Sequence, residues 1–211
     1  MSDGSTILRH ALVDRIFHWV TAAAALTLLG TAFLPILGVM FPWVTAHWIA
    51  GLVLAAAVLF HVVRALGWQN RGAMWIGAAD LRDGVDTVRF ALRASARPPR
   101  KPGKYSLAQK LIHALFAVVI LTTVVTGGLM LVRIDTPFWE RDPYWLSSEA
   151  WGLVYVLHDL AALMLISMVI VHVYFALRPE KLLFTRAMLR GRITREEYLR
   201  HHDPARWQVE P

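Results

Sequence analysis

Apolar residues are concentrated in four long runs, which polar stretches separate. The runs cover about residues 16–34, 43–63, 111–132 and 151–177. Each run reaches the length of about 20 residues that a helix needs to cross the hydrocarbon core of a bilayer. The pattern predicts an all-α membrane protein in which four transmembrane helices form a bundle, within a single integral-membrane domain over residues 1–211. The polar lead around Arg9 and Arg15 predicts that the first run is a retained helix and not a cleaved signal peptide.

Two of the polar stretches are expected to hold short helices outside the bilayer core. Within residues 78–94, apolar side chains recur at helical spacing with charges between them, so we expect an interfacial helix, which Gly84 weakens. The tail, residues 178–211, is expected to form a short amphipathic cytoplasmic helix and a polar end. Residues 134–150, IDTPFWERDPYWLSSEA, are rich in proline, acids and aromatics, and predict either a structured cap or a docking surface for a partner.

The basic residues are distributed unevenly between the polar stretches. The chain has 22 lysines and arginines and a formal net charge of +7, but only Arg133 and Arg141 lie between the first and second or the third and fourth runs. By the positive-inside rule, the other basic stretches and both termini lie in the cytoplasm. The bias therefore predicts topology and contact with anionic lipid, and it argues against nucleic-acid binding.

The composition narrows the chemistry that the chain can perform. Of its 211 residues 56% are hydrophobic, which is typical of membrane proteins, and none is cysteine. Disulfides, thiolate chemistry and iron–sulfur ligation within the chain are therefore excluded. Any iron–sulfur cluster in the same pathway must belong to a partner.

The fourth run carries two histidines in an otherwise apolar stretch, LHDLAALMLISMVIVHV. His158 and His172 are 14 residues apart. At about 3.6 residues per turn and about 1.5 Å per residue, both face the same way and stand about 21 Å apart along the helix. An ionisable side chain inside a span indicates function. Two imidazoles on one stripe at this separation predict two stacked haems, each of which needs a second axial ligand from a facing helix.

The predicted topology supplies candidates for those second ligands. His47 is level with His158 near the outer side of the membrane, and the small residues Gly51 and Ala162, one turn further along, would leave flat space for a porphyrin. Three histidines are level with His172 near the inner side: His18, His61 and His113. Periodicity does not choose among these three. Because His47 and His61 are also 14 residues apart, a scheme with all four ligands on two helices is an alternative.

Five segments resemble the cytochrome b (gamma) subunit of respiratory formate dehydrogenase. They are DRIFHW around His18, AHWIAG around His47, GKYSLAQK before the third run, LHDLAALMLISMVIVHVYFAL in the fourth run, and HHDPARW in the tail. The resemblance covers nearly the whole chain in order. The related b subunits of nickel–iron hydrogenase and thiosulfate reductase share the helices but match these loops less well.

The resemblance implies a four-helix bundle with two b-type haems. It implies that His47 and His158 ligate the iron of the outer haem, and that His18 and His172 ligate the iron of the inner haem. His61 and His113 are then packing or proton-side groups. The resemblance also implies a site near the inner haem for a quinone, menaquinone or ubiquinone, formed by Ser106, Ala108, Gln109 and His172. Two of these depart from the family pattern, which has asparagine in place of Ser106 and glycine in place of Ala108.

The expected function is therefore that of a membrane-anchoring electron-transfer and quinone-reducing subunit in the bacterial inner membrane. An iron–sulfur beta subunit and a molybdenum- or tungsten-pterin alpha subunit would lie on the outer side, and formate would be oxidised there, because this chain offers no candidate site for that reaction. The alternatives are the cytochrome b subunit of a nickel–iron hydrogenase and a stand-alone di-haem cytochrome b. A histidine-lined metal or proton transporter, which would be colourless, and a plain anchor are the competing classes.

Overall fold

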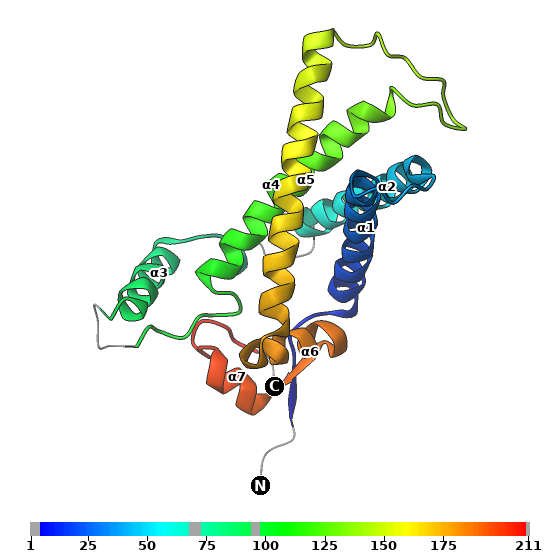
Figure 1. Ribbon diagram of the computed structural model, residues 1–211. Coiled ribbons are helices and arrows are strands. Elements are labelled where there is room, and N and C mark those ends of the chain that lie inside the picture. The colour runs from blue at the N-terminus through cyan, green and yellow to red at the C-terminus, as the bar shows by residue number, and fades with distance from the viewer. Residues whose placement is uncertain (1–4, 68–72, 94–97, 210–211) are drawn as a thin grey trace. The chain divides into compact units, whose positions relative to one another are not determined.

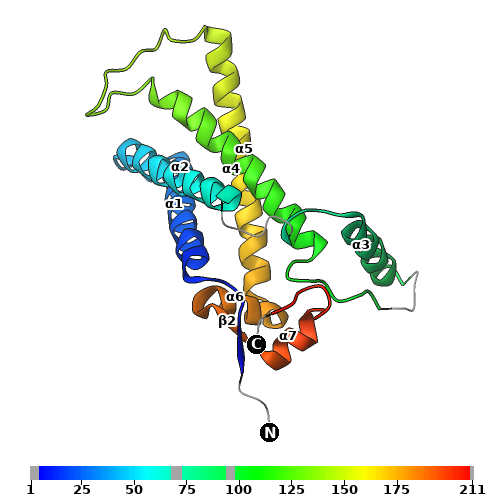
Figure 2. The ribbon, with the colours of Figure 1, turned by 180° about the vertical axis from the view of Figure 1, so that it is seen from behind.

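The computed structural model describes residues 5–67, 73–93 and 98–209, and it is almost entirely helical (Figures 1 and 2). The chain packs into two compact units. One, which we call the bundle unit, comprises residues 16–64 and 116–175. The other, which we call the polar unit, comprises residues 1–15, 65–115 and 176–211.

Four helices among the described residues are long and apolar enough to cross a membrane, which confirms the predicted fold class. They are α1 (Leu12–Ile36), α2 (Trp43–Gly67), α4 (Leu107–Leu131) and α5 (Ser148–Leu177). Three of them begin earlier than the apolar runs, because a turn with polar side chains continues the helix once the backbone hydrogen bonds are formed. The prediction of a single domain over the whole chain stays a prediction.

The core of the bundle unit lies between the depths of the histidines. Leu54 of α2 and Leu165 of α5 are each only 1% exposed. Leu54 packs in one cluster with residues of α1 and α4, and Leu165 packs in a second cluster with residues of the same two helices. Leu165 is seven residues from both His158 and His172, which is about two helical turns. The best-buried residues of the bundle unit therefore lie in its middle, with one histidine level on each side of them.

The short helix α3 (Ala78–Ala91) confirms the helix expected within residues 78–94. Gly84 has a specific role there, because a Cβ atom at this position would overlap the Cδ2 atom of Leu107 at the start of α4. The residue that weakens the helix is thus the one that allows it to pack. Lys110 fixes the same contact, since its Nζ donates to the carboxylate of Asp80 at 2.9 Å and to the carbonyl of Trp75 at 2.8 Å.

The tail forms more structure than the single amphipathic helix that the sequence predicts. It contains the 3-10 helix η2 (Pro179–Lys181), α6 (Leu182–Arg190), the strand β2 (Arg192–Thr194) and α7 (Arg195–His201). Strand β2 pairs antiparallel with β1 (Thr6–Leu8), with Ile7 opposite Ile193. The turn between α6 and β2 requires Gly191, because φ is +84° and a Cβ atom would lie 2.9 Å from the carbonyl oxygen of His10. The two ends of the chain therefore fold together.

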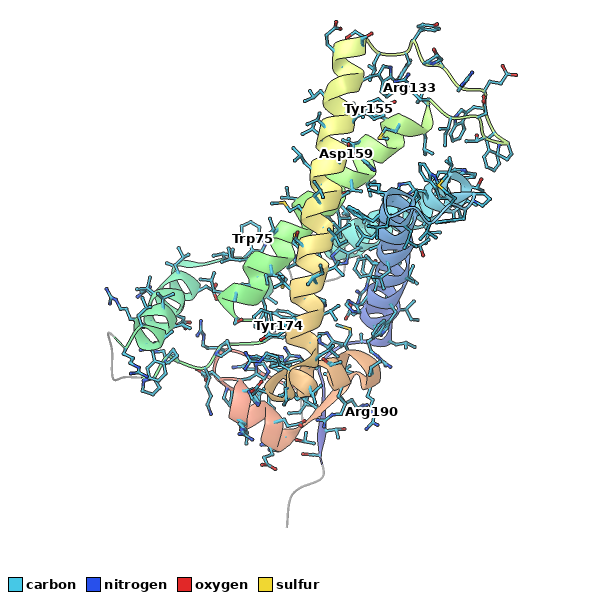
Figure 3. The ribbon with its side chains drawn as sticks, in the orientation of Figure 1. Trp75, Arg133, Tyr155, Asp159, Tyr174 and Arg190 are labelled. Carbon is cyan, nitrogen blue, oxygen red and sulfur yellow. The ribbon has the colours of Figure 1, made fainter. Side chains whose placement is uncertain are left out.

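The loop between α4 and α5 folds back on the ends of these two helices. Arg133 donates to the Tyr155 hydroxyl at 2.8 Å, and Figure 3 shows the two side chains turned toward one another. The indole of Trp151 donates to the Pro143 carbonyl at 3.0 Å. The loop is thus structured, as the cap alternative expects. Phe138 and Tyr144 remain 75% and 90% exposed, so the docking alternative stays a prediction.

Candidate functional site

The structure brings four of the predicted site residues together in two pairs within the bundle unit. His47 of α2 faces His158 of α5, with ring centroids 6.3 Å apart and planes at 65°. His18 of α1 faces His172 of α5, also with centroids 6.3 Å apart and planes at 52°. Helix α5 thus contributes one histidine to each pair, as its 14-residue spacing predicts.

The separation within each pair fits one metal ion between two imidazoles. A ligating imidazole nitrogen lies about 2 Å from its metal and about 1 Å from the ring centre, so rings on opposite sides of one ion have centres roughly 6 Å apart. The 6.3 Å between the centroids agrees with this value in both pairs. Two imidazoles on opposite sides of an iron are the ligands of a bis-histidine haem. The residues present therefore fit the cofactor that the sequence predicts.

The two rings of the first pair are each bonded to a buried threonine. The Nδ1 atom of His47 lies 2.8 Å from the Thr31 hydroxyl on α1. The Nδ1 atom of His158 lies 2.8 Å from the Thr126 hydroxyl on α4. Sequence reasoning missed both threonines, because a threonine in an apolar helix bonds to its own helix and leaves no mark in the pattern.

A glycine next to Thr126 leaves room for the His158 ring. A Cβ atom at Gly127 would lie 3.2 Å from the Cε1 atom of His158, whereas a Cβ atom at Gly128 would meet open space. A Cβ atom at Gly51 would lie 4.0 Å from the Cδ2 atom of Leu28, and the space that Gly51 and Ala162 would leave for a porphyrin stays a prediction.

Aromatic rings border the second pair. The edge of Phe116 approaches His172, with centroids 5.9 Å apart and planes at 82°, and Trp19 lies edge-on to His18 at 5.1 Å. One turn along α1 from His18, the Thr21 hydroxyl is buried and has no hydrogen-bond partner among the described residues. A buried hydroxyl in this position is consistent with a neighbour that the protein itself does not supply.

The remaining candidate partners of His172 are His61 and His113. The ring of His61 stacks on Phe17 at 4.4 Å with planes at 13°. His113 lies in the part of α4 that belongs to the polar unit. The ring that faces His172 is that of His18, and the pairing therefore follows the arrangement that the family resemblance implies.

The stretch expected to contact quinone begins α4. The Ser106 backbone N–H donates to Oε1 of Gln109 at 2.9 Å, and the Gln109 backbone N–H lies 3.4 Å from the Ser106 hydroxyl. This reciprocal arrangement is a capping box, which satisfies backbone donors at a helix start. The two residues therefore have a structural role beside the predicted one. The Gln109 amide nitrogen is not used by the cap and is left to donate to another group.

The polar unit contains a buried cluster that sequence reasoning did not identify. Arg9 and His202, each 2% exposed, are joined by a hydrogen bond of 2.7 Å from the guanidinium to the Nε2 atom. Because this nitrogen accepts, the Nδ1 atom of His202 carries the proton and donates to the Gly103 carbonyl at 2.7 Å. The guanidinium also lies over the rings of Phe184 and Trp207, at 4.8 and 5.5 Å from their centroids.

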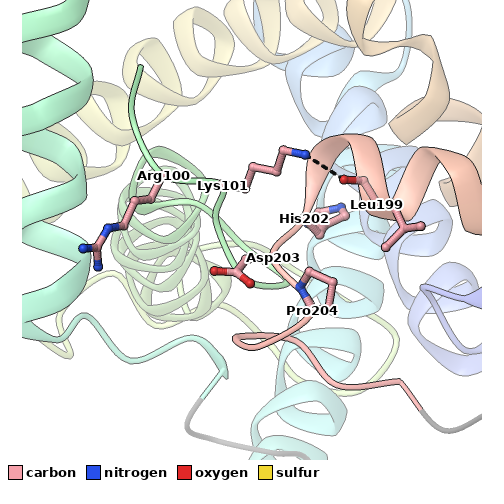
Figure 4. Close-up of a pocket in the computed structure, with 6 residues that line it drawn as sticks. All are labelled: Arg100, Lys101, Leu199, His202, Asp203 and Pro204. Atoms are coloured by element: carbon pink, nitrogen blue, oxygen red, sulfur yellow. Dashed lines mark hydrogen bonds between the residues drawn. The ribbon is translucent and has the colours of Figure 1, made fainter. Parts of the chain in front are cut away.

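Burial changes the acid–base properties of this cluster. It lowers the pKa of Arg9 to about 10, so the guanidinium remains charged at neutral pH. Burial, and secondarily the charge of Arg9, lower the pKa of His202 to about 4. His202 also borders a recess whose other lining residues are Arg100, Lys101, Leu199, Asp203 and Pro204 (Figure 4). Both ring nitrogens of His202 are engaged, so this histidine has no nitrogen left for a metal.

The comparisons with known proteins agree with the geometry of the bundle unit. A family model described as prokaryotic cytochrome b561 matches residues 9–191. A search of the curated proteins found no match. Proteins of the matched family are membrane cytochromes that bind b-type haem. Because the match spans all four apolar helices and both histidine pairs, this chain belongs to the prokaryotic cytochrome b561 family and is a membrane cytochrome b that transfers electrons.

Proposed function

We propose that the chain is the di-haem cytochrome b subunit of a formate dehydrogenase, which passes electrons from an iron–sulfur partner across the membrane to quinone. The observation that supports this most is the presence of two histidine pairs with the same ring separation of 6.3 Å. A packed layer around Leu54 and Leu165 lies between them in depth. Two sites at two depths are what a transmembrane electron path requires.

His47 and His158 would hold one haem, and His18 and His172 the other. Bound haem supplies one-electron transfer. With one imidazole from each of two helices as its ligands, a bound haem would be suited to electron transfer and would have no position left for oxygen. Apolar residues of the core and the ring of Phe116 lie next to the second pair.

The chain would lie in the inner membrane of a bacterium. In the proposed orientation both termini are in the cytoplasm. This orientation rests on the positions of Arg133 and Arg141, the only basic residues in the two predicted outer loops. An electron that moves inward against an inside-negative potential requires about 2.3 kcal/mol per 100 mV. Proton uptake at the cytoplasmic side during quinone reduction would then make the turnover electrogenic.

The partner subunits would bind at the loop between α4 and α5. Phe138, Tyr144 and Trp145 are 75%, 90% and 55% exposed there, although Arg133 and Trp151 hold the loop in place. Exposed aromatics on an ordered backbone are typical of residues that contribute most to protein interfaces. The iron–sulfur subunit would lie against this surface, and the pterin subunit would oxidise formate.

The haem assignment is tested by counting haem per chain after substitution of the ligands. His47→Ala and His18→Ala should each lose one of two b-type haems, because bis-histidine binding needs both rings. His61→Ala is the matched control, since its ring stacks on Phe17 next to the pair, and it should retain both haems. A colourless wild-type protein, or haem loss in His61→Ala with none in His18→Ala, would contradict the assignment.

The quinone site requires a variant that separates its two roles. Gln109→Glu keeps the capping-box acceptor for Ser106 but loses the amide that could donate to a quinone carbonyl. We expect slower quinone reduction in Gln109→Glu, with normal haem content and normal reduction by the donor. If Gln109→Glu is as fast as the wild type while Gln109→Ala is slow, the residue acts only through the helix cap.

The identity of the donor complex is tested by purification from native membranes. Co-purification of a pterin enzyme with formate-dependent haem reduction supports the proposal. Co-purification of a nickel–iron enzyme with hydrogen-dependent reduction would assign the chain to a hydrogenase. A chain that purifies alone and exchanges electrons with small soluble carriers would be a stand-alone cytochrome.

A further inference from the structure

We infer that Thr31 and Thr126 are positioning residues that fix the tautomer and the direction of the His47 and His158 rings. Through these two hydrogen bonds they set the properties of one haem separately from the other. The inference rests on the proposed function, because it concerns the haem that His47 and His158 would hold. It assigns a role to two buried side chains that are not themselves ligands.

The hydroxyl proton of each threonine is already used in a hydrogen bond within its own helix. The Thr31 hydroxyl donates to the carbonyl of Thr27 at 2.7 Å, one turn back along α1. The Thr126 hydroxyl donates in the same way to the carbonyl of Thr122 at 2.6 Å. A hydroxyl has one proton, so toward the imidazole each threonine can only accept. The Nδ1 atoms of His47 and His158 must therefore carry the protons, and their Nε2 atoms present lone pairs.

The two contacts between a threonine and a histidine ring are similar in geometry. Thr31 lies on α1 and serves a ring on α2, which follows it, while Thr126 lies on α4 and serves a ring on α5, which follows it. Both distances from Oγ1 to Nδ1 are 2.8 Å, and both threonines are 5% exposed. In each helical hairpin, a threonine on the first helix therefore orients the histidine on the second helix. The two rings are held from opposite sides of the same site.

Two other threonines of the same helices show the ordinary hydrogen bond of a threonine to its own helix. Thr123 is also a buried threonine of α4, at 8% exposure, and its hydroxyl donates to Val119 at 2.9 Å. Thr27 of α1 donates to Ala23 in the same way. These two residues show the hydrogen bond to the helix without a contact to a ring. Thr123 is therefore a matched control for Thr126, and Thr27, which is exposed, controls for loss of the hydrogen bond within α1.

The electronic consequence follows from the second partner of a ligating histidine. A hydrogen bond from Nδ1–H makes the imidazole a stronger donor to its metal and holds the ring orientation. A stronger donor favours the oxidised iron and lowers the reduction potential. Aromatic edges border the His18–His172 pair instead. Loss of a threonine hydroxyl should therefore raise the potential of one haem and leave that of the other unchanged.

The experiment is a redox titration of the purified complex, with haem content and electron paramagnetic resonance spectra measured on the same samples. Thr31→Val and Thr126→Val should keep two haems, shift one of two titration waves upward and change the low-spin signal of that haem. Thr31→Ser and Thr126→Ser should restore both. Thr27→Val and Thr123→Val should match the wild type in all three measurements.

The outcomes separate this inference from the proposed function on which it rests. If the wild type lacks two haems, the proposed function fails. If the wild type has two haems and both valine variants leave both waves and signals unchanged, the inference alone is wrong. If a valine variant loses a haem, the serine variant decides: restored haem supports the hydrogen bond, whereas continued loss shows that the threonine acts by packing.

Discussion

Partly or fully buried histidines occur in both units of the protein, but they differ in the use of their two ring nitrogens. In the bundle unit, the Nδ1 atoms of His47 and His158 are each hydrogen-bonded to a threonine hydroxyl, and the two ring centroids are 6.3 Å apart. In the polar unit, both ring nitrogens of His202 form hydrogen bonds, one with Arg9 and one with the Gly103 carbonyl. Its nearest aromatic neighbour, Trp207, has its centroid only 4.7 Å away.

The difference shows that burial alone does not identify a ligand. A buried imidazole with both nitrogens engaged by protein is a structural link, and His202 joins parts of the chain 193 residues apart in this way. A partly buried imidazole with one oriented nitrogen and one nitrogen left for a ligand is prepared for a metal. Substitutions in the two units should therefore have effects of different kinds.

The largest expected difference between the units is in haem content. His158→Ala should lose one haem completely, because a bis-histidine site cannot form with one ring. His202→Ala should retain both haems when the protein is purified under mild conditions. Pyridine haemochrome assays on the two variants measure this directly, and loss of a haem in His202→Ala would erase the distinction drawn between the units.

The second effect concerns the stability of the polar unit. His202→Ala removes a hydrogen-bond acceptor from the buried Arg9 guanidinium, whose Nε already has no partner among the described residues. Removal of a neutral hydrogen-bond acceptor from a buried charged group costs roughly 3 kcal/mol. Hydrogen exchange measured by mass spectrometry should show faster exchange in β1 and β2. Arg9→Leu/His202→Leu, which removes the charge together with its partner, should recover part of the protection.

The third effect is a dependence on pH. The pKa of His202 is lowered to about 4 in the folded protein, so the folded state favours the neutral ring. Below about pH 6.5 the unfolded state takes up a proton that the folded state does not, and stability falls with pH until about pH 4. The total loss is about 3 kcal/mol. Exchange rates corrected for intrinsic chemistry should show this loss in the polar unit.

A variant without a titrating ring provides the control for this pH dependence. In His202→Gln the side-chain amide can accept from Arg9 and donate to Gly103, but it does not titrate. Protection in this variant should change less between pH 6.5 and 4 than in the wild type. An equal change in both proteins would assign the effect to another group.

The smallest effect should appear at the glycine pair of α4. Gly127→Ala places a Cβ atom 3.2 Å from the His158 ring, so the ring must shift by a few tenths of an ångström, at a cost of about 1–2 kcal/mol. Gly128→Ala meets open space and should be neutral or slightly stabilising. A change in the haem spectrum of Gly127→Ala without one in Gly128→Ala would support the ring contact, and identical spectra would argue against it.

The apolar pattern predicted most of the bundle unit. Four helices follow from the length of the runs, and the positions of His158 and His172 follow from the helical period, because both features are local in the sequence. The pattern did not select His18 from among the three possible partners of His172. That choice depends on how helices far apart in the sequence face each other, and it came from the family resemblance.

The polar unit and the positioning residues were less accessible to sequence reasoning. Strand β1 has only three residues and pairs with a strand near the other end of the chain, so neither strand forms a recognisable pattern alone. Arg9 and His202 are polar residues in polar stretches, where burial is not expected. Thr31 and Thr126 satisfy their own helices, and their contact with a ring depends on tertiary structure.

The 14-residue spacing of His158 and His172 restricts how α5 can change during evolution. One residue inserted between His158 and His172 would rotate the second histidine by about 100° relative to the first and remove it from its facing ring. Only insertions or deletions close to whole helical turns would preserve both alignments, and each would alter the interval between the two histidine pairs by about 5 Å or more. The distance between the two histidine pairs along the helix can therefore change only in steps of about one helical turn.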